Sequence, residues 1–388
     1  MIFMAKLIDI TGKALSGEWG LDDDNGSGIP VLRTTNFTNE GIVNYDNVVT
    51  RKISKKNISE KFLKKGDILI EKSGGSDKFP VGRVIYYDGE NDKYLFNNFT
   101  GLLRIKNVTT WYPKYVFYSL FANYKRGGTR CFENKTTGLH NLKTDDYVQR
   151  YEIAELSIKK QMRICDNLDK IHSIIISQKK ELSYLDELVK ARFVEMFVDR
   201  GYPVKTIGDV IDRKITRVAK AFDKTDVIQY LDISSIDSSS KTVKKLTRYI
   251  LAEAPSRAQY VLKYNDIMYS TVRPNLQNVA INTCSEENVV GSTGFCILRC
   301  IGVTVGYMWG VMNSISFTEA MTNQATGASY PAVTDKVVYS YKIPIPPKEE
   351  QIVYEQLVRQ IAKSKAVIEK SLKELETLQA SLMQKYFS

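Results

Sequence analysis

Two polar segments of the chain carry side chains of the kinds that bind nucleic acids. Residues 72–83 include adjacent glycines and three cations, and residues 270–278 include an arginine, amides and hydroxyls. Glycine lets a backbone approach a ligand closely. Cations bind phosphates, Arg can fork onto guanine, and Asn or Gln can pair with adenine. We predict DNA contacts from Lys72, Ser73, Gly74, Gly75, Lys78 and Arg83 in the first segment, and from Thr271, Arg273, Asn275 and Gln277 in the second.

Further cations and amides extend both candidate surfaces. Contacts to phosphate position a protein on DNA, whereas only contacts to base edges specify a sequence. For each of these residues the alternative is a solvated polar side chain without a ligand. The additional candidates are Arg33, Asn36, Arg126 and Arg130 in the first half of the chain, and Arg217, Arg257, Asn323 and Gln324 in the second.

Catalytic motifs are missing from the sequence. The Gly-rich segment Ser73–Ser76 lacks the Gly-Lys-Thr/Ser that completes a phosphate-binding loop, and there is no Gly-x-Gly-x-x-Gly fingerprint. An amino-methyltransferase Asn-Pro-Pro-aromatic tetrapeptide is also absent. The two histidines are His140, in a loop where it could touch a phosphate, and His172, in a helical segment. Residues 133–135 match the end of a nuclease motif, but no metal-binding Asp accompanies them. We predict no catalytic residue, metal ligand or cofactor in this chain.

The net charge of +11 lies on the globular parts of the chain. Residues 1–150 carry +6 and residues 199–342 carry +4, whereas residues 151–198 and 343–388 carry 0 and +1. A basic globular surface favours a polyanionic ligand, since phosphate contacts supply affinity that is independent of sequence. The alternative is a basic protein without such a ligand.

The chain contains a long internal repeat. A Thr-Asp pair, and an Ile and a Gln eight residues apart, recur 190 positions later, and Gly66–Leu69 recurs 199 positions later as Asn265–Met268. This spacing is far longer than a solenoid period, so the repeating unit is a domain with its helix. Such a protein is expected to bind a ligand with two matching halves. The other matched positions are Thr144-Asp145 and Thr334-Asp335, Ile153 and Ile343, and Gln161 and Gln351.

One segment in each copy has the seven-residue apolar repeat of paired helices. In residues 157–197, and in the equivalent part of the second copy, apolar residues recur at alternating steps of four and three, as in a coiled coil. A helix of about 40 residues is roughly 60 Å long, and its apolar stripe needs a partner. We predict that the two helices pair antiparallel and hold the globular units at a fixed separation; the alternative is that each packs on its own domain. The seam residues are Leu168, Ile171, Ile175, Leu182 and Leu185, then Val358, Ile361, Ile368, Leu372 and Leu375, with polar Gln178, Lys365 and Gln379 interrupting the repeat.

The globular part of each copy has the pattern of a largely antiparallel α+β domain. Short apolar or alternating runs are separated by turn signals and followed by a helical segment. The predicted boundaries are a first globular domain at 1–150, a central long helix at 151–198, a second globular domain at 199–342 and a C-terminal long helix at 343–388. Expected strands are Ile29–Leu32, Asp67–Ile70, Val81–Tyr87, Leu102–Ile105, Tyr230–Ile233, Asp266–Tyr269 and Phe295–Leu298, and expected helices are Pro113–Tyr124 and Gly302–Met312.

The composition indicates a folded protein of a reducing compartment. The chain is 43% hydrophobic and has no apolar run of about 18 residues, so we expect neither a transmembrane helix nor a membrane partner. Its start does not have the pattern of a signal peptide. Five cysteines without metal-ligand spacing suggest buried thiols and a cytoplasmic location.

Several short motifs mark the two copies. They are Gly66–Leu69, Gly74-Gly75, Pro80–Arg83, Asn265–Ile267, Thr271–Asn275, Thr326-Gly327, Ile343–Pro347 and Glu350-Gln351. In this order and duplication, over essentially the whole chain, they resemble the specificity subunit of a type I restriction-modification system. The first copy departs from the pattern at residues 153–157, which replace the proline-rich entry to the long helix.

The resemblance implies two tandem target-recognition domains, each reading one half of a split, asymmetric DNA site, with the long helices setting the gap. It implies double-stranded DNA as ligand and two methyltransferase subunits as partners, which bind S-adenosylmethionine and methylate adenine at N6. Restriction subunits that use ATP and Mg²⁺ would join them. The adenine would be flipped out of the duplex. Two rival interpretations are a self-contained DNA methyltransferase or nuclease, and a non-enzymatic coiled-coil adaptor between proteins.

Overall fold

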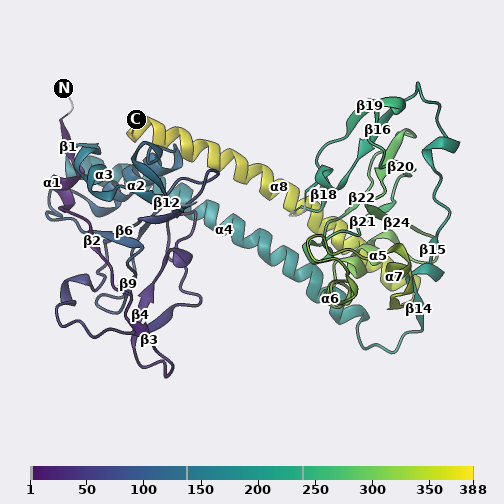
Figure 1. Ribbon diagram of the computed structural model, residues 1–388, viewed down its shortest axis with the longest axis horizontal. Coiled ribbons are helices and arrows are strands. Elements are labelled where there is room, and N and C mark those ends of the chain that lie inside the picture. Colours follow the sequence, from purple (N-terminus) through teal and green to yellow (C-terminus); the bar gives the residue numbers. More distant parts are fainter. Residues whose placement is uncertain (1–2, 137–138, 238–239, 388) are drawn as a thin grey trace. The chain divides into compact units, whose positions relative to one another are not determined.

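The chain folds into two compact units. The computed structural model describes residues 3–136, 139–237 and 240–387. Unit 1 comprises Met1–Lys180 and Glu369–Ser388, and unit 2 comprises Glu181–Ile368. Each unit is a mixed domain of strands and helices, and the two long helices each contribute residues to both units (Figure 1).

Unit 1 contains two four-stranded sheets with an apolar core between them. Neighbouring strands are antiparallel except in one pair, β4 and β9, which is parallel. The first sheet has the order β2 (Leu15–Ser16), β10 (Thr100–Leu103), β6 (Ile68–Glu71) and β8 (Val84–Tyr86); the second has the order β3 (Leu21–Asp22), β5 (Val49–Lys52), β4 (Ile29–Leu32) and β9 (Leu95–Phe96).

Unit 2 repeats this plan. It also has two four-stranded sheets, and it also has one parallel pair, β16 with β23. The first sheet has the order β15 (Ile211–Asp212), β24 (Phe295–Cys300), β21 (Ile267–Ser270) and β22 (Val279–Ile281); the second has the order β19 (Thr247–Ile250), β16 (Val227–Leu231), β23 (Val289–Ser292) and β20 (Ala258–Val261). The predicted, largely antiparallel α+β fold is therefore confirmed in both units, although several strands begin or end a few residues from their expected bounds.

The central strand of each first sheet serves two cores. In β6, Ile68 and Ile70 belong to the core that contains helix α2 (Pro113–Lys125), while Leu69 belongs to the core between the sheets. Strand β21 repeats this alternation with Met268 in the inter-sheet core. Because successive side chains of a strand point to opposite faces, a wholly apolar strand is what a sheet covered on both sides requires.

A buried ion pair recurs beside these strands. Arg104 forks onto both carboxylate oxygens of Asp67 at 2.8 and 2.6 Å, and Arg299 onto those of Asp266 at 2.9 and 2.7 Å. Each aspartate also accepts a hydrogen bond from a backbone N–H three residues earlier. The repeated aspartate of the sequence is therefore part of the fold.

A two-stranded ribbon leads into each long helix. In unit 1, β1 (Met4–Lys6) pairs with β13 (Glu152–Ala154); in unit 2, β14 (Val204–Thr206) pairs with β25 (Lys342–Pro344). Helices α4 (Ile158–Phe197) and α8 (Lys348–Phe387) follow. Both ribbons are antiparallel, so the first copy has the same entry geometry although it lacks the prolines of the second.

A buried glutamine in the first turns of each long helix anchors it to its unit. Gln161 accepts a hydrogen bond from the backbone N–H of Tyr112, and Gln351 accepts one from that of Thr304, both at 2.8 Å. Their amide groups donate to nearby carbonyls. These N–H groups begin helices α2 and α5 (Val305–Met312), so the repeated glutamine satisfies donors that a helix start leaves unpaired.

Within each unit the two long helices contact each other in antiparallel order. In unit 1, His172 lies 3.2 Å from Gln379, and Gln178 donates to Ser371 at 2.9 Å. In unit 2, Lys365 pairs with Asp186 at 2.7 Å. The helices thus pair with each other. The ten predicted seam residues are buried or half-buried, Leu168, Ile175 and Ile361 being the most buried.

Two expectations about composition can be compared with the structure. No helix among the described residues is long and apolar enough to cross a membrane. The expectation of buried thiols is wrong for Cys131, which is exposed, whereas Cys165 and Cys296 are buried.

Candidate DNA interface

The Gly-rich candidate segment of unit 1 forms an edge strand and a tight turn. Strand β7 (Ser73–Gly75) pairs with β12 (Leu139–Leu142), which pairs with β11 (Glu133–Thr136). Gly74 has φ +137°, and a Cβ there would lie 2.9 Å from a carboxylate oxygen of Glu71. A side chain at this position would therefore be strained on both counts.

The turn after β7 presents a cation and an aromatic ring to solvent. Lys78 and Phe79 are both exposed, and the Lys78 ammonium lies 5.3 Å from the centre of the Phe79 ring. Arg130 donates to the backbone carbonyls of Asp77 and Lys78 at 3.2 and 3.3 Å. The structure thus brings Lys78 and Arg130 together at this turn.

His140 and Glu133 contact this turn from the neighbouring strands β12 and β11. His140 is 5% exposed; its Nδ1 lies 2.9 Å from Glu133, and its Nε2 lies 3.6 Å from Asp77. Glu133 also accepts a hydrogen bond from the Val81 backbone N–H at 3.0 Å. The idea that His140 touches a phosphate is therefore wrong, since its ring is enclosed. The Lys135 side chain lies outside the described residues.

Four other predicted residues of unit 1 have partners within the fold. Arg83 donates to the carbonyls of Phe37 and Thr34, both at 2.9 Å, and pairs with Glu71 at 3.3 Å. Burial raises the pKa of Glu71, partly offset by Arg83. The other three are the buried Asn36, which bonds the backbone of Arg33, Asn44 and Asp46; the half-buried Arg33, which donates to Asn47; and the half-buried Lys72, which donates to Ser16.

Two of these predictions are corrected. Arg83 and Asn36 hold neighbouring loops together, because their polar atoms are used by backbone groups and Glu71. Burial lowers the pKa of Lys72. Arg126 is exposed, but it donates to the carbonyl of Phe387 at 3.0 Å near the end of α8, where a cation stabilises the last turn of a helix.

The candidate segment of unit 2 is a short turn with two residues in the left-handed region. Arg273 has φ 51° and Gln277 has φ 50°, and they flank the one-turn helix η8 (Pro274–Leu276). The Arg273 N–H donates to the carbonyl of Pro331 at 2.7 Å. Its guanidinium lies 5.0 Å from the centre of the Tyr330 ring, which is exposed.

Other predicted residues of unit 2 divide into supporting and exposed groups. Thr271 is buried and donates to Gly294, and Gln277 donates to Thr318 and accepts from Lys241; their prediction as DNA contacts is corrected, because the fold uses their polar atoms. The exposed group is Arg217, which lies over the Tyr260 ring, together with Arg257, Arg273, Asn275, Asn323 and Gln324.

Some of these exposed residues lie close together in the structure, although they are far apart in the sequence. Turn η8 packs on helix α6 (Ile315–Gln324), which places Asn275 beside that helix. Tyr330 was missed, although the Thr326-Gly327 motif marks its loop. Lys241 was also missed. Burial lowers its pKa to about 8, and the nearby cations Lys190 and Lys365 act in the same direction.

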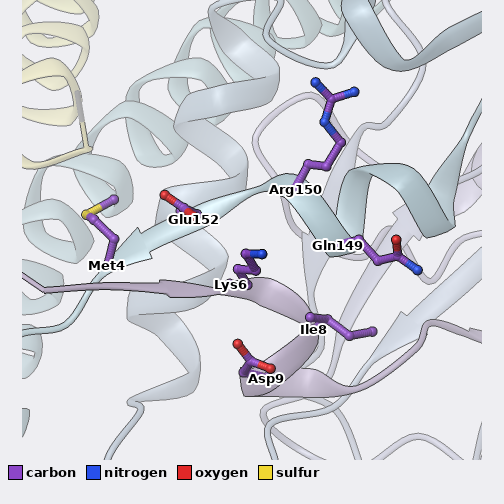
Figure 2. Close-up of a pocket in the computed structure, with 7 residues that line it drawn as sticks. All are labelled: Met4, Lys6, Ile8, Asp9, Gln149, Arg150 and Glu152. Atoms are coloured by element: carbon purple, nitrogen blue, oxygen red, sulfur yellow. The ribbon is translucent and has the colours of Figure 1, made fainter.

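A polar hollow lies elsewhere in unit 1. It has a volume of about 620 Å³ and lies against the β1–β13 ribbon (Figure 2). Among the described residues, no group of three or more His, Cys, Asp or Glu could hold a metal ion. The lining residues are Met4, Lys6, Ile8, Asp9, Gln149, Arg150 and Glu152.

Comparison with known proteins places the chain by its fold. No family model matches it. No curated protein matches it in sequence. Among solved structures it is similar to the type I restriction-modification S subunit from M. genitalium, with a TM-score of 0.60, 14% identity and coverage of 100% of this chain and 96% of that one. It is also similar to a chain from a structure on complex assembly and conformational transition of the type I R-M system, with a TM-score of 0.53, 14% identity and coverage of 100% and 97%. The chain has the fold of these proteins along its whole length.

Proposed function

We propose that this chain is the DNA sequence-specificity subunit of a type I restriction-modification complex. Each unit reads one half of a split, asymmetric site, and the chain itself carries no catalytic residue. The observation that carries the proposal is the end-to-end fold match to an S subunit, at a TM-score of 0.60 over 100% of this chain.

The surfaces of the two units support this assignment. Each has an exposed cation beside an exposed aromatic ring at the segment that joins two equivalent strands, β6 to β8 in unit 1 and β21 to β22 in unit 2. The pairs are Lys78 with Phe79 in unit 1, and Arg273 with Tyr330 of a separate loop in unit 2. Cations and exposed rings are the usual means of holding phosphates and bases. Different side chains at equivalent places suit two different half-sites.

The chemistry belongs to partners in this proposal. Two methyltransferase subunits bind S-adenosylmethionine and methylate adenine at N6, and restriction subunits that use ATP and Mg²⁺ cut DNA. The complex would act in the cytoplasm, where the host DNA lies.

The decisive experiment is methylome sequencing. The chain is co-expressed with its cognate methyltransferase subunit in a host that lacks adenine methylation. We expect N6-methyladenine in one bipartite motif with a fixed gap, and none when either protein is expressed alone. Methylation or cutting by the purified chain alone would favour a self-contained enzyme. Absence of sequence preference in the reconstituted complex would favour a coiled-coil adaptor.

The helices can be tested as the ruler of the gap. One heptad is inserted into α4 and a matching heptad into α8, so that the seam stays in phase. We expect the same two half-motifs with a longer gap. A matched control inserts seven residues in the exposed loop around Gly201, outside the helices. An unchanged gap in the heptad variant would show that the paired helices do not set the spacing between the half-motifs.

A further inference from the structure

The turn of unit 2 holds Arg273 in a conformation that a non-glycine residue rarely adopts. Arg273 has φ 51° and ψ 64°, and Gln277, four residues later, has φ 50° and ψ 40°. Two such residues in one short turn are unfavourable for L-amino acids. Strained residues persist when their surroundings over-determine them, and they concentrate at ligand-binding sites.

Several hydrogen bonds impose this conformation. The Arg273 N–H donates to Pro331, the Gln277 N–H donates to Pro274, and the Gln277 side chain donates to Thr318 at 2.7 Å. The segment after Val272 is also tied by a bridge between Val272 and Ala332. The backbone of the turn is therefore held in this conformation by contacts within the unit.

The Arg273 side chain lies over a ring that faces solvent. Tyr330 is 69% exposed, its ring centre is 5.0 Å from the Arg273 guanidinium, and the guanidinium also donates to the Ser329 carbonyl at 3.3 Å. An exposed aromatic ring gains little from the fold, whereas a ring backed by a cation is a good stacking platform for a base.

We propose that Tyr330 is a specificity-determining residue of unit 2 that stacks on a base of its half-site while Arg273 contacts the adjoining base edge. This inference rests on the proposed function and assigns it a chemical group. The equivalent turn of unit 1 supports the assignment, because Phe79 is 58% exposed beside Lys78.

The test uses the chain assembled with its methyltransferase subunits. Tyr330→Ala is compared with Tyr330→Phe, which keeps the ring, and with Tyr264→Ala, which removes a ring of unit 2 that is 59% exposed and lies in another turn. We expect Tyr330→Ala to lower the preference for the correct base in one half-site by about tenfold. Tyr330→Phe and Tyr264→Ala should leave both half-motifs and the Tm unchanged.

A second variant separates recognition from folding. Arg273→Gly relieves the left-handed strain, since glycine adopts positive φ readily. We expect its Tm to be unchanged or higher while the preference in the same half-site falls by about tenfold. A lower Tm with equal losses in both half-sites would overturn the inference in favour of a structural role. A Tyr330→Ala variant that behaves like Tyr264→Ala would also overturn it, yet the intact bipartite motif would leave the proposed function standing.

Discussion

The candidate segments of the two units follow equivalent strands, β6 and β21, but they are supported in different ways. In unit 1 two glutamates support the turn: Glu71, which pairs with Arg83, and Glu133, which lies 2.9 Å from the His140 ring. In unit 2 the residue equivalent to Glu71 is Ser270, which donates to the Val272 carbonyl. The Asp–Arg pair and the buried glutamine of the long helix are nevertheless the same in both units.

This contrast separates what the fold repeats from what it varies. The repeated groups connect sheets and long helices, so both copies need them in the same geometry. The varied groups lie next to the turns, where a change of side chain alters the ligand surface without disturbing the cores. Under the proposed function, two halves of one chain can therefore keep the same internal contacts and read different sequences.

The largest expected loss of stability comes from breaking the Asp–Arg pair that both units share. Asp266→Ala leaves Arg299 without its carboxylate, and we expect a loss of about 3 kcal/mol in the free energy of unfolding. Asp67→Ala should cost less, because the side chain of Arg104 is 30% exposed and that of Arg299 is 14% exposed. Urea denaturation with hydrogen exchange would measure the loss and locate it in one unit.

A double variant serves as the control for this prediction. Replacing Asp266 by Leu together with Arg299 by Met removes both charges, so much of the lost stability should return. An equal or larger loss in the double variant would contradict the view that the unpaired buried charge is the main cost.

The next effect tests the charged support of unit 1. Arg83→Met removes two hydrogen bonds to carbonyls and leaves Glu71 without its cation, so we expect a loss of about 2 kcal/mol. Lys78→Ala, at an exposed neighbour, should leave stability within about 0.5 kcal/mol but weaken DNA binding and reduce its salt dependence. Thermal unfolding and salt-dependent binding of the assembled complex would distinguish them. If Arg83→Met unfolds at the wild-type temperature, the contacts of Arg83 within the fold do not stabilise it, and Arg83 remains a candidate for contacting DNA.

The frame was more predictable from the sequence than the recognition surface. Apolar strands, the seam and the repeated Asp and Gln all follow local rules of spacing, so β6, β21 and both long helices could be placed. Arg83 and Gln277 were predicted as DNA contacts because their type suits that role, but their partners lie far away in the sequence. Tyr330 was missed because it lies next to Arg273 only in the folded protein, where contacts of Pro331 and Ala332 bring the two loops together.

A smaller effect tests the seam. Among the residues that the structure describes, the buried Oε1 atom of Gln178 has no hydrogen-bond partner. Gln178→Leu should therefore raise the free energy of unfolding by about 1 kcal/mol. Lys365→Leu should bring no such gain, because Lys365 already pairs with Asp186. Chemical denaturation of the two variants would measure this. If only Lys365→Leu raised the free energy of unfolding, the presence or absence of a hydrogen-bond partner would not explain the cost of a polar residue in the seam.

The smallest expected effect concerns pH and belongs to unit 2. Burial, then Lys190 and Lys365, lower the pKa of Lys241 from 10.5 to about 8, while Asp186 opposes the shift. The folded protein thus releases this proton at lower pH than the unfolded chain, so stability should rise between about pH 8 and pH 10.5. The gain is on the order of 1 kcal/mol once solvent screening is allowed for. Stability curves against pH for wild type and Lys241→Met should diverge in this window, because only the wild type carries the group. Parallel curves would mean that Lys241 keeps its proton throughout this window in the folded protein, as it does in the unfolded chain.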